Sequence, residues 1–352
     1  MPHASHDGIF GYVTQAAVRL LQEYVRTVAY PERHAAADPP CWPDGVVGDH
    51  TALYLDLLEA DGLPCRWASS AGEQTDDHRR WMRYLAVVAV HHQSAPGTVT
   101  RQLAALTERG DTLLPHEWSF AADEPQLIGL RHHEPRSRDE AEVRPPDDLF
   151  VLLLNGRTFY FSGSTDANPS PRREAYLVEG QHRYRFNWHN ISPGRRDRIY
   201  KAARPAGAGV MVVRDVHGHN ALTPQNRADG LDPRPNPTIN IHWSGLGRSN
   251  WSAGCQVISG RRYLNDEGQA IDCSAYTARN GRERGSRRTA GGPRLTMGAY
   301  TVLSDLLLCY TPQQRVGEKP TFRYTLLDRS TLDAVPGLDV AALGERLNLL
   351  RS

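Results

Sequence analysis

A histidine and a cysteine lie close enough in this sequence to share one reaction. His242 ends an apolar run, and Cys255 stands 13 residues later (255 − 242), after a segment that contains serine and glycine. The thiolate form of cysteine is the nucleophile, and a neighbouring imidazole activates it by taking the thiol proton. If the intervening loop folds back, the thiol attacks an amide and forms a thioester, which an amine or water then resolves. The pair therefore predicts an acyl-transfer site.

The residues just before the cysteine predict a sharp turn that carries hydrogen-bond donors. Gly254 permits the chain to turn steeply, and Ser252 is expected to help shape the turn. The backbone amides of Ala253, Gly254 and Cys255 are then candidate donors to an oxyanion, each worth about 2–4 kcal/mol of barrier when preorganised. A buried free thiol and an unrelated histidine are the ordinary alternatives for either residue alone. The joint occurrence of these residues favours catalysis over both alternatives.

These residues resemble the L,D-transpeptidase (YkuD-like) family, which carries a histidine at a strand end and Ser-x-Gly-Cys downstream. The resemblance covers residues 148–328 and implies that Cys255 is the nucleophile and His242 the general base. It also implies that a backbone carbonyl near Trp243 or Ser244 orients the imidazole in place of an acidic residue. The implied activity is that of an L,D-transpeptidase, or of an L,D-carboxypeptidase or endopeptidase. The motif leaves open whether an amine or water accepts the acyl group.

The sequence departs from the family pattern at three points around the cysteine. Ala253 stands where the family usually has a basic or aromatic residue, and Gln256-Val257 replaces the usual Ile/Val-Arg. The connection between the histidine and the cysteine is also short for the family. These departures leave the nucleophile and the base in place and put the substrate pocket in question. The residues expected to bind substrate are Trp243, Ser244, Arg248, Trp251 and His189.

An internal repeat opens the chain. Residues 7–11 (DGIFG), which precede Thr14, match residues 44–48 (DGVVG), which precede Thr51, at an offset of 37 (44 − 7). Each copy predicts a glycine turn that leads into a helix capped by the threonine. The first copy, which ends at Gln22, resembles the small helical peptidoglycan-binding domain found beside many wall hydrolases. A helical hairpin with capped ends and no ligand is the alternative.

Strand patterns dominate from residue 148 onward. Two β runs flank Asn155-Gly156, a dipeptide typical of two-residue hairpins, and a helix is expected over 295–308. The strand content and the resemblance together imply an α+β fold class, a small N-terminal helical domain followed by a β-rich YkuD-like catalytic domain. The expected divisions are a peptidoglycan-binding-like helical domain (1–70), a helical segment (71–130), a linker (131–147), the L,D-transpeptidase-like catalytic domain (148–330) and a C-terminal tail or helix (331–352).

The composition argues against several classes of protein. The 352 residues carry 41 basic and 40 acidic side chains, a net charge of +1, so neither nucleic acid nor a membrane is expected as a partner. His217-Gly218-His219 could ligate zinc but lacks a clear third ligand, so no metal and no cofactor is expected, and a zinc peptidase is disfavoured. The five cysteines are too few for a disulfide scaffold, and a bridge between Cys41 and Cys65 stays an open question.

The N-terminal residues show no basic and apolar leader. We therefore expect synthesis in the cytoplasm without a signal peptide and action in the periplasm or cell wall after secretion by a non-classical route. Peptidoglycan is the expected partner. If the chain is a delivered antibacterial effector or a phage-type lytic protein, a secretion apparatus or an immunity protein is a further expected partner. The alternative function is a non-catalytic peptidoglycan-binding component that keeps a decayed enzyme fold.

Overall fold

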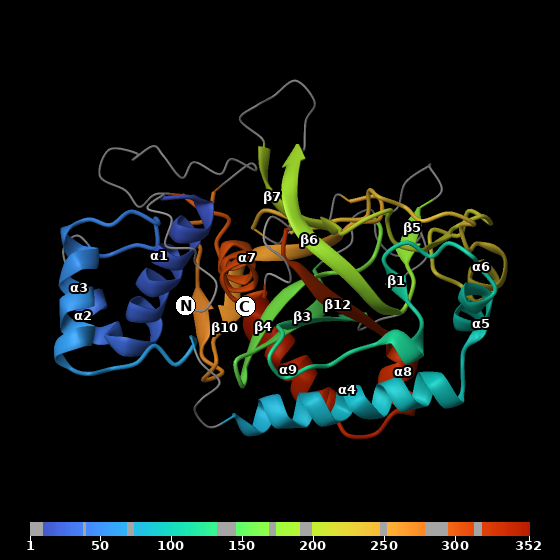
Figure 1. Ribbon diagram of the computed structural model, residues 1–352, viewed down its shortest axis with the longest axis horizontal. Coiled ribbons are helices and arrows are strands. Elements are labelled where there is room, and N and C mark those ends of the chain that lie inside the picture. Colours follow the sequence, from blue (N-terminus) through green and yellow to red (C-terminus); the bar gives the residue numbers. More distant parts are fainter. Residues whose placement is uncertain are drawn as a thin grey trace.

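In a computed structural model, the chain is described over residues 10–37, 40–68, 74–131, 146–168, 174–190, 199–246, 252–278, 295–312 and 319–352 (Figure 1). Within these ranges eight strands close into a barrel, because β7 pairs back onto β6. The neighbours β9–β10 and β12–β2 are parallel, and the other pairs of the barrel are antiparallel. In order around the barrel the strands are β6 (Gly180–Asn190), β12 (Thr321–Asp328), β2 (Gln126–Arg131), β3 (Asp148–Leu154), β4 (Arg157–Ser164), β10 (Gln256–Leu264), β9 (Ile241–Trp243) and β7 (Ile199–Pro205).

The β3–β4 hairpin shows how local sequence sets part of this barrel. Its turn runs through Asn155 and Gly156, whose φ angles of 48° and 74° are those that a two-residue hairpin loop requires. The predicted hairpin is confirmed. β3 is buried on both faces, since Phe150 packs in the main core and Val151 packs in a second apolar cluster. Shorter strands extend the sheet or pair beside it, namely β1 (Thr112–Leu113) on β6, β11 (Ala270–Asp272) on β10, and β5 (Ala175–Leu177) with β8 (Val212–Arg214).

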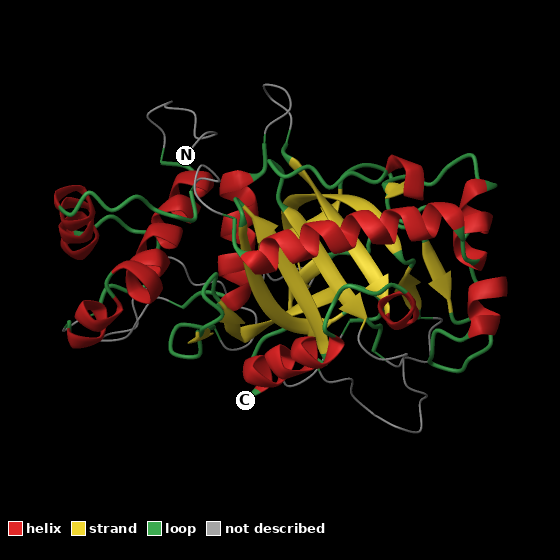
Figure 2. Cartoon of the chain, turned by 90° about the horizontal axis from the view of Figure 1, so that it is seen from below, coloured by secondary structure: helices red, strands yellow, loops and turns green. Residues whose placement is uncertain are grey.

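Helices cover the barrel and bury the two clusters. α4 (Asp76–Ser94) crosses one face of the sheet, and α9 (Val340–Arg351) contacts β3, β4 and β10 (Figure 2). α7 (Ala299–Tyr310) is buried almost throughout and packs against β10. Every helix in the described ranges falls short of the length and apolarity that a membrane span requires. The remaining helices are α1 (Tyr12–Tyr24), η1 (Val25–Ala29), α2 (Pro31–Ala36), α3 (Asp49–Ala60), α5 (Thr98–Ala104), η2 (Pro115–Glu117), α6 (Pro224–Asp229) and α8 (Arg329–Ala334).

One side chain of α1, Gln22, holds the turn of the second copy of the repeat. The Gln22 amide donates to the Asp44 carboxylate, the Val46 carbonyl and the Thr51 hydroxyl at 3.0 Å each, and its oxygen accepts from the Gly45 amide at 2.8 Å. Gln22, the last residue of the motif in the first copy, therefore has a structural role, which is to hold the turn that precedes α3.

The expected helix caps of the repeat are wrong. The residues that cap α1 and α3 are Gly11 and Gly48, so the threonines lie inside the helices. The reason is that each helix begins one residue after the second glycine of its repeat, which already has extended backbone angles.

The expected fold class, a small N-terminal helical domain followed by a β-rich YkuD-like catalytic domain, is wrong. The sheet does not form an open sandwich, because β6 pairs with both β12 and β7 and thereby joins the two edges of the sheet. β2 also enters the barrel from before residue 148. The N-terminal helices are not separate either, since α1 packs against α7 and Arg19 forms a buried ion pair with Asp305 at 2.6 Å.

Candidate active site

Cys255 and His242 lie on two neighbouring parallel segments, His242 within β9 and Cys255 directly before β10. In the register of β9 and β10, Ile241 is the partner of Gln256 and His242 is the partner of Val257. Ile241 belongs to the main core, and side chains alternate along a strand, so His242 points to the opposite face. Cys255 stands directly before Gln256, the first residue of β10, and its Sγ contacts the backbone of Thr238 and Asn240 just ahead of β9. The register thus sets the two side chains diagonally across from each other.

The thiol of Cys255 is held by backbone groups. Its Sγ accepts a hydrogen bond from the Asn240 amide at 3.4 Å and donates to the Thr238 carbonyl at 3.3 Å. The Cys255 amide donates to the Ser252 hydroxyl at 2.8 Å, so Ser252 closes the turn. One of the three expected oxyanion donors is therefore occupied. The amides of Ala253 and Gly254 have no acceptor among the described residues, so they remain able to bind an oxyanion.

His242 is oriented by its own strand. Its Nδ1 lies 2.9 Å from the carbonyl oxygen of Trp243, the kind of contact that the resemblance implied. A carbonyl only accepts, so this nitrogen carries the proton and Nε2 keeps a lone pair. The ring stacks on His189 with centroids 5.3 Å apart and planes inclined by 17°. Nδ1 of His189 lies 3.4 Å from the side-chain nitrogen of Asn240, which fixes the second ring in turn.

The electrostatics favour a neutral pair at rest. Burial raises the pKa of the Cys255 thiol above its ordinary 9.0, although the Asn240 amide, Ser252 and Arg204 act in the other direction. Burial also lowers the pKa of His242 below 6.5, against the opposing effect of the Trp243 carbonyl. No hydrogen bond joins Cys255 to His242 in the described part of the chain. A neutral imidazole is suited to general-base catalysis, in which it takes the proton as the thiol attacks.

The other residues expected at the site fall into three groups. His189 lies beside His242 as described above, and Ala253 is exposed on the turn before the cysteine. Trp243 points into the core with 4% of its surface exposed, so only its carbonyl serves the site. The Ser244 hydroxyl is buried and has no hydrogen-bond partner among the described residues. Arg248 and Trp251 lie outside the described residues.

Three residues at this face were not anticipated from the sequence, namely Asn240, Arg185 and Arg204. The last two lie on β6 and β7, neither of which was expected as a strand. A signal for β6 does exist, because Tyr184 and Phe186 alternate with charged and polar residues, which is the period of a half-buried strand.

Two other features stand apart from the thiol. Among the described residues, no three or more histidine, cysteine, aspartate or glutamate side chains converge as a metal site would require. His217 instead pairs with Asp229 at 3.2 Å. The five cysteines are free, Cys41 and Cys65 included. A cleft of about 490 Å³ opens further along β6, with Asp111, Glu124, Arg183, Lys319 and Arg323 among its lining.

Gly254 fits a space that no other residue fits. A Cβ atom there would lie 2.7 Å from the Ala175 carbonyl oxygen, and its φ is 157°. We expect Gly254→Ala to shift the turn and to slow Cys255-dependent turnover about tenfold or more, because the thiol loses its alignment. The matched control is Gly344→Ala, where an added Cβ meets nothing within 4 Å. Full activity in Gly254→Ala would show that the tight turn is irrelevant to the chemistry.

Comparisons with protein-family models, with curated proteins and with solved structures find no match to this chain. The arrangement of Cys255, His242 and their neighbours is therefore the ground on which a function is argued.

Proposed function

We propose that the chain is a cysteine-dependent acyl-transfer enzyme that acts on peptidoglycan stem peptides, as an L,D-transpeptidase or an L,D-carboxypeptidase or endopeptidase. The observation that carries the proposal is the register of β9 and β10. There Cys255 lies diagonally across from His242, and the lone pair of the imidazole Nε2 is available because Nδ1 bonds to the Trp243 carbonyl. A buried structural thiol would have no need of an oriented base.

The proposed reaction runs in two steps. His242 takes the thiol proton as Sγ of Cys255 attacks the carbonyl carbon of the substrate amide, and the amides of Ala253 and Gly254 stabilise the oxyanion. The C–N bond then breaks, the imidazolium returns its proton to the leaving amine, and a thioester remains. An amine or water attacks the thioester, its proton passes to His242, and the thiol is regenerated.

Peptidoglycan is the substrate that the sequence motifs support. The Ser-x-Gly-Cys motif with its upstream histidine is similar to that of wall transpeptidases, and the repeat at residues 7–11 and 44–48 is similar to wall-binding modules. The half-buried thiol and the base oriented by a carbonyl agree with amide chemistry. Cys255 and His242 would act in the same way on another class of peptide. The experiment below therefore uses peptidoglycan itself as the substrate.

The test is a digest of purified peptidoglycan with the wild type and with Cys255→Ala, followed by mass spectrometry of the muropeptides. We expect changes with the wild type and none with the variant, because a thiol nucleophile has no substitute in alanine. New cross-linked dimers or exchanged terminal D-amino acids would define a transpeptidase, whereas shortened stems or lost crosslinks would define a hydrolase. Identical profiles for wild type, variant and blank would refute the enzyme and favour a wall-binding component.

A further inference from the structure

Two arginines oppose each other on the side of the barrel that carries Cys255. Arg185 and Arg204 are direct partners in the antiparallel β6–β7 register. Like charges in this position repel each other and destabilise a sheet. Both side chains are partly exposed, and neither forms an ion pair or hydrogen bond with any described residue. The repulsion between Arg185 and Arg204 therefore lowers the stability of the isolated chain. An anion bound between the two side chains would remove this repulsion.

The strand register leads from this pair to the thiol. Ala203 pairs with Ile241, and Ile241 pairs with Gln256, which fixes one row across β7, β9 and β10. One residue along, the next row contains Arg204, Asn240 and Cys255. Neighbouring strands lie about 4.8 Å apart, so the Cα atoms of Arg204 and Cys255 are separated by roughly 10 Å. An arginine side chain spans much of that gap.

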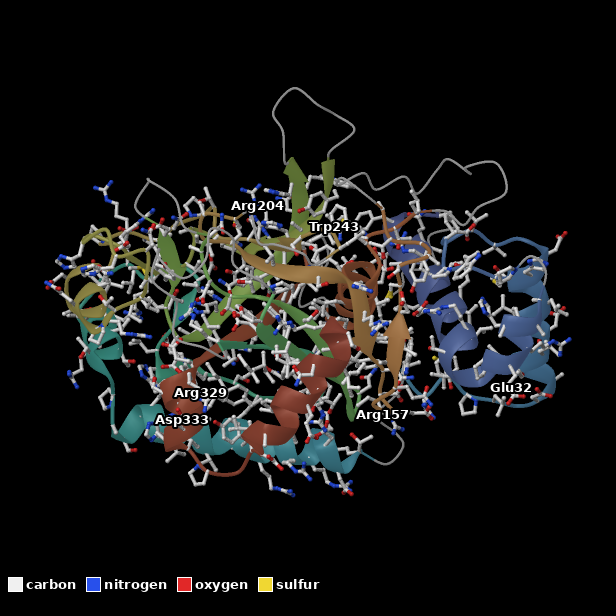
Figure 3. The ribbon with its side chains drawn as sticks, turned by 180° about the vertical axis from the view of Figure 1, so that it is seen from behind. Glu32, Arg157, Arg204, Trp243, Arg329 and Asp333 are labelled. Carbon is white, nitrogen blue, oxygen red and sulfur yellow. The ribbon has the colours of Figure 1, made fainter. Side chains whose placement is uncertain are left out.

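Arg204 lies at the end of the molecule from which the β6–β7 hairpin projects, and Arg329 lies at the other side of the view (Figure 3). Arg204 also acts electrostatically on the site, since its charge works against the larger effect of burial on the pKa of Cys255 and adds to that of burial on His189. The charge of Arg204 therefore acts on the thiol, and the register places the two residues two strands apart.

We propose that Arg204, together with Arg185, binds a carboxylate of the acyl donor next to the amide that Cys255 attacks. The inference rests on the proposed function and names the recognition that it requires. A planar guanidinium matches a carboxylate in a bidentate geometry, and two of them around one anion cancel their mutual repulsion. A stem peptide offers two such groups near the scissile bond, the C-terminal carboxylate of the leaving D-amino acid and the side-chain carboxylate of the diamino acid.

The first experiment uses two alkylating reagents of nearly equal size and opposite electrostatic character. The Cys255 thiolate displaces iodide from iodoacetate, which is an anion, or from iodoacetamide, which is neutral, and a new S–C bond forms as the C–I bond breaks. The ratio of the two rates at Cys255, read by peptide mass spectrometry, reports a cationic site beside the thiol. We expect Arg204→Gln to lower the iodoacetate-to-iodoacetamide ratio about fivefold or more, and the Arg185→Gln double variant to lower it further.

The control is Arg329→Gln, which removes an exposed arginine of α8 and should leave the ratio unchanged. Both reagents react with the same thiolate, so a change in the pKa of Cys255 alters both rates equally and cancels in the ratio. Arg204→Lys keeps a positive charge and should retain part of the preference. Equal ratios in the wild type, Arg204→Gln and the double variant would overturn the proposal.

The second experiment identifies the carboxylate with synthetic tetrapeptide stems. One stem carries a C-terminal amide and the other a side-chain amide, and KM and kcat of each are compared with those of the unmodified peptide. We expect one amidation to raise KM about tenfold in the wild type, and this difference to vanish in Arg204→Gln. If no stem reacts but the alkylation ratio behaves as expected, the proposed function fails and the anion site stands. Turnover that is insensitive to both amidations and to Arg204→Gln would overturn the carboxylate site.

Discussion

Replacement of His242 by glutamine is expected to slow acyl-enzyme formation about a thousandfold at pH 7, within the range ascribed to general-base catalysis. Glutamine fills similar space but cannot take the thiol proton. The pKa of His242 lies below 6.5 through burial, so the wild-type base is already neutral at pH 7 and its rate should be flat from there to pH 9. The variant depends on spontaneous thiolate, and the pKa of Cys255 lies above 9.0 through burial. Its rate should therefore rise about tenfold per pH unit over the same range.

The measurement is single-turnover formation of the thioester, followed by mass spectrometry at each pH. His50→Gln is the matched control, because this exposed histidine of α3 is remote in the sequence from the site and should leave the profile unchanged. A variant with a flat profile parallel to the wild type would show that His242 does not act as the base. A wild type whose rate falls with rising pH would exclude the neutral resting pair.

Removal of Arg131 is expected to cause the largest loss of stability. Arg131 ends β2, is 1% exposed, and forms ion pairs with Asp328 at 2.6 Å and Asp166 at 3.1 Å. It also donates to the carbonyls of Thr165 and Leu177. Arg131→Ala leaves these carboxylates buried without their main counter-ion, which costs about 3–5 kcal/mol of unfolding free energy. Urea denaturation followed by circular dichroism measures this loss.

Arg329→Ala provides the comparison for that experiment. It removes an exposed pair with Asp333 one helical turn away, and such pairs contribute about 0.5 kcal/mol or less. Arg131→Lys keeps the charge but loses the fork geometry, so its unfolding free energy should fall between the wild type and Arg131→Ala. Equal midpoints and slopes for Arg131→Ala and Arg329→Ala would refute a stabilising role for the buried pairs.

Local features of this fold could be predicted from the sequence, whereas its closure could not. Asn155-Gly156 specifies a hairpin because few dipeptides tolerate two positive φ angles in succession, and the apolar run of 299–310 specifies a buried helix. Closure depends on β7 pairing with both β6 and β9, and its register with β9 consists of one pair, Ala203 with Ile241. No short-range pattern encodes so distant a contact, and the resemblance to a known family pointed to a different arrangement.

The candidate site also has a part that could be predicted from the sequence and a part that could not. Cys255 and His242 were recognisable because their chemistry is specific and their spacing in the sequence is short. His189 was named but its stacking on His242 was not, since the two residues are 53 positions apart (242 − 189). Arg204 and Asn240 depend on the register of three strands, which the sequence does not state. The direction of the Trp243 side chain depends on the same register. This side chain packs in the main core and does not reach the candidate site.

Because β9 and β10 are parallel neighbours, this chain should tolerate some genetic insertions near its thiol and reject others. The chain leaves β9 at one end of the pair and enters β10 at the other, so residues can be added between Ser244 and Ser252 without altering either strand. A single residue inserted within β9 ahead of His242 would reverse the facing of one partner relative to the other. Natural variants should therefore differ in the length of the connection between β9 and β10. The number of residues within each strand should stay the same, so that each side chain keeps its direction.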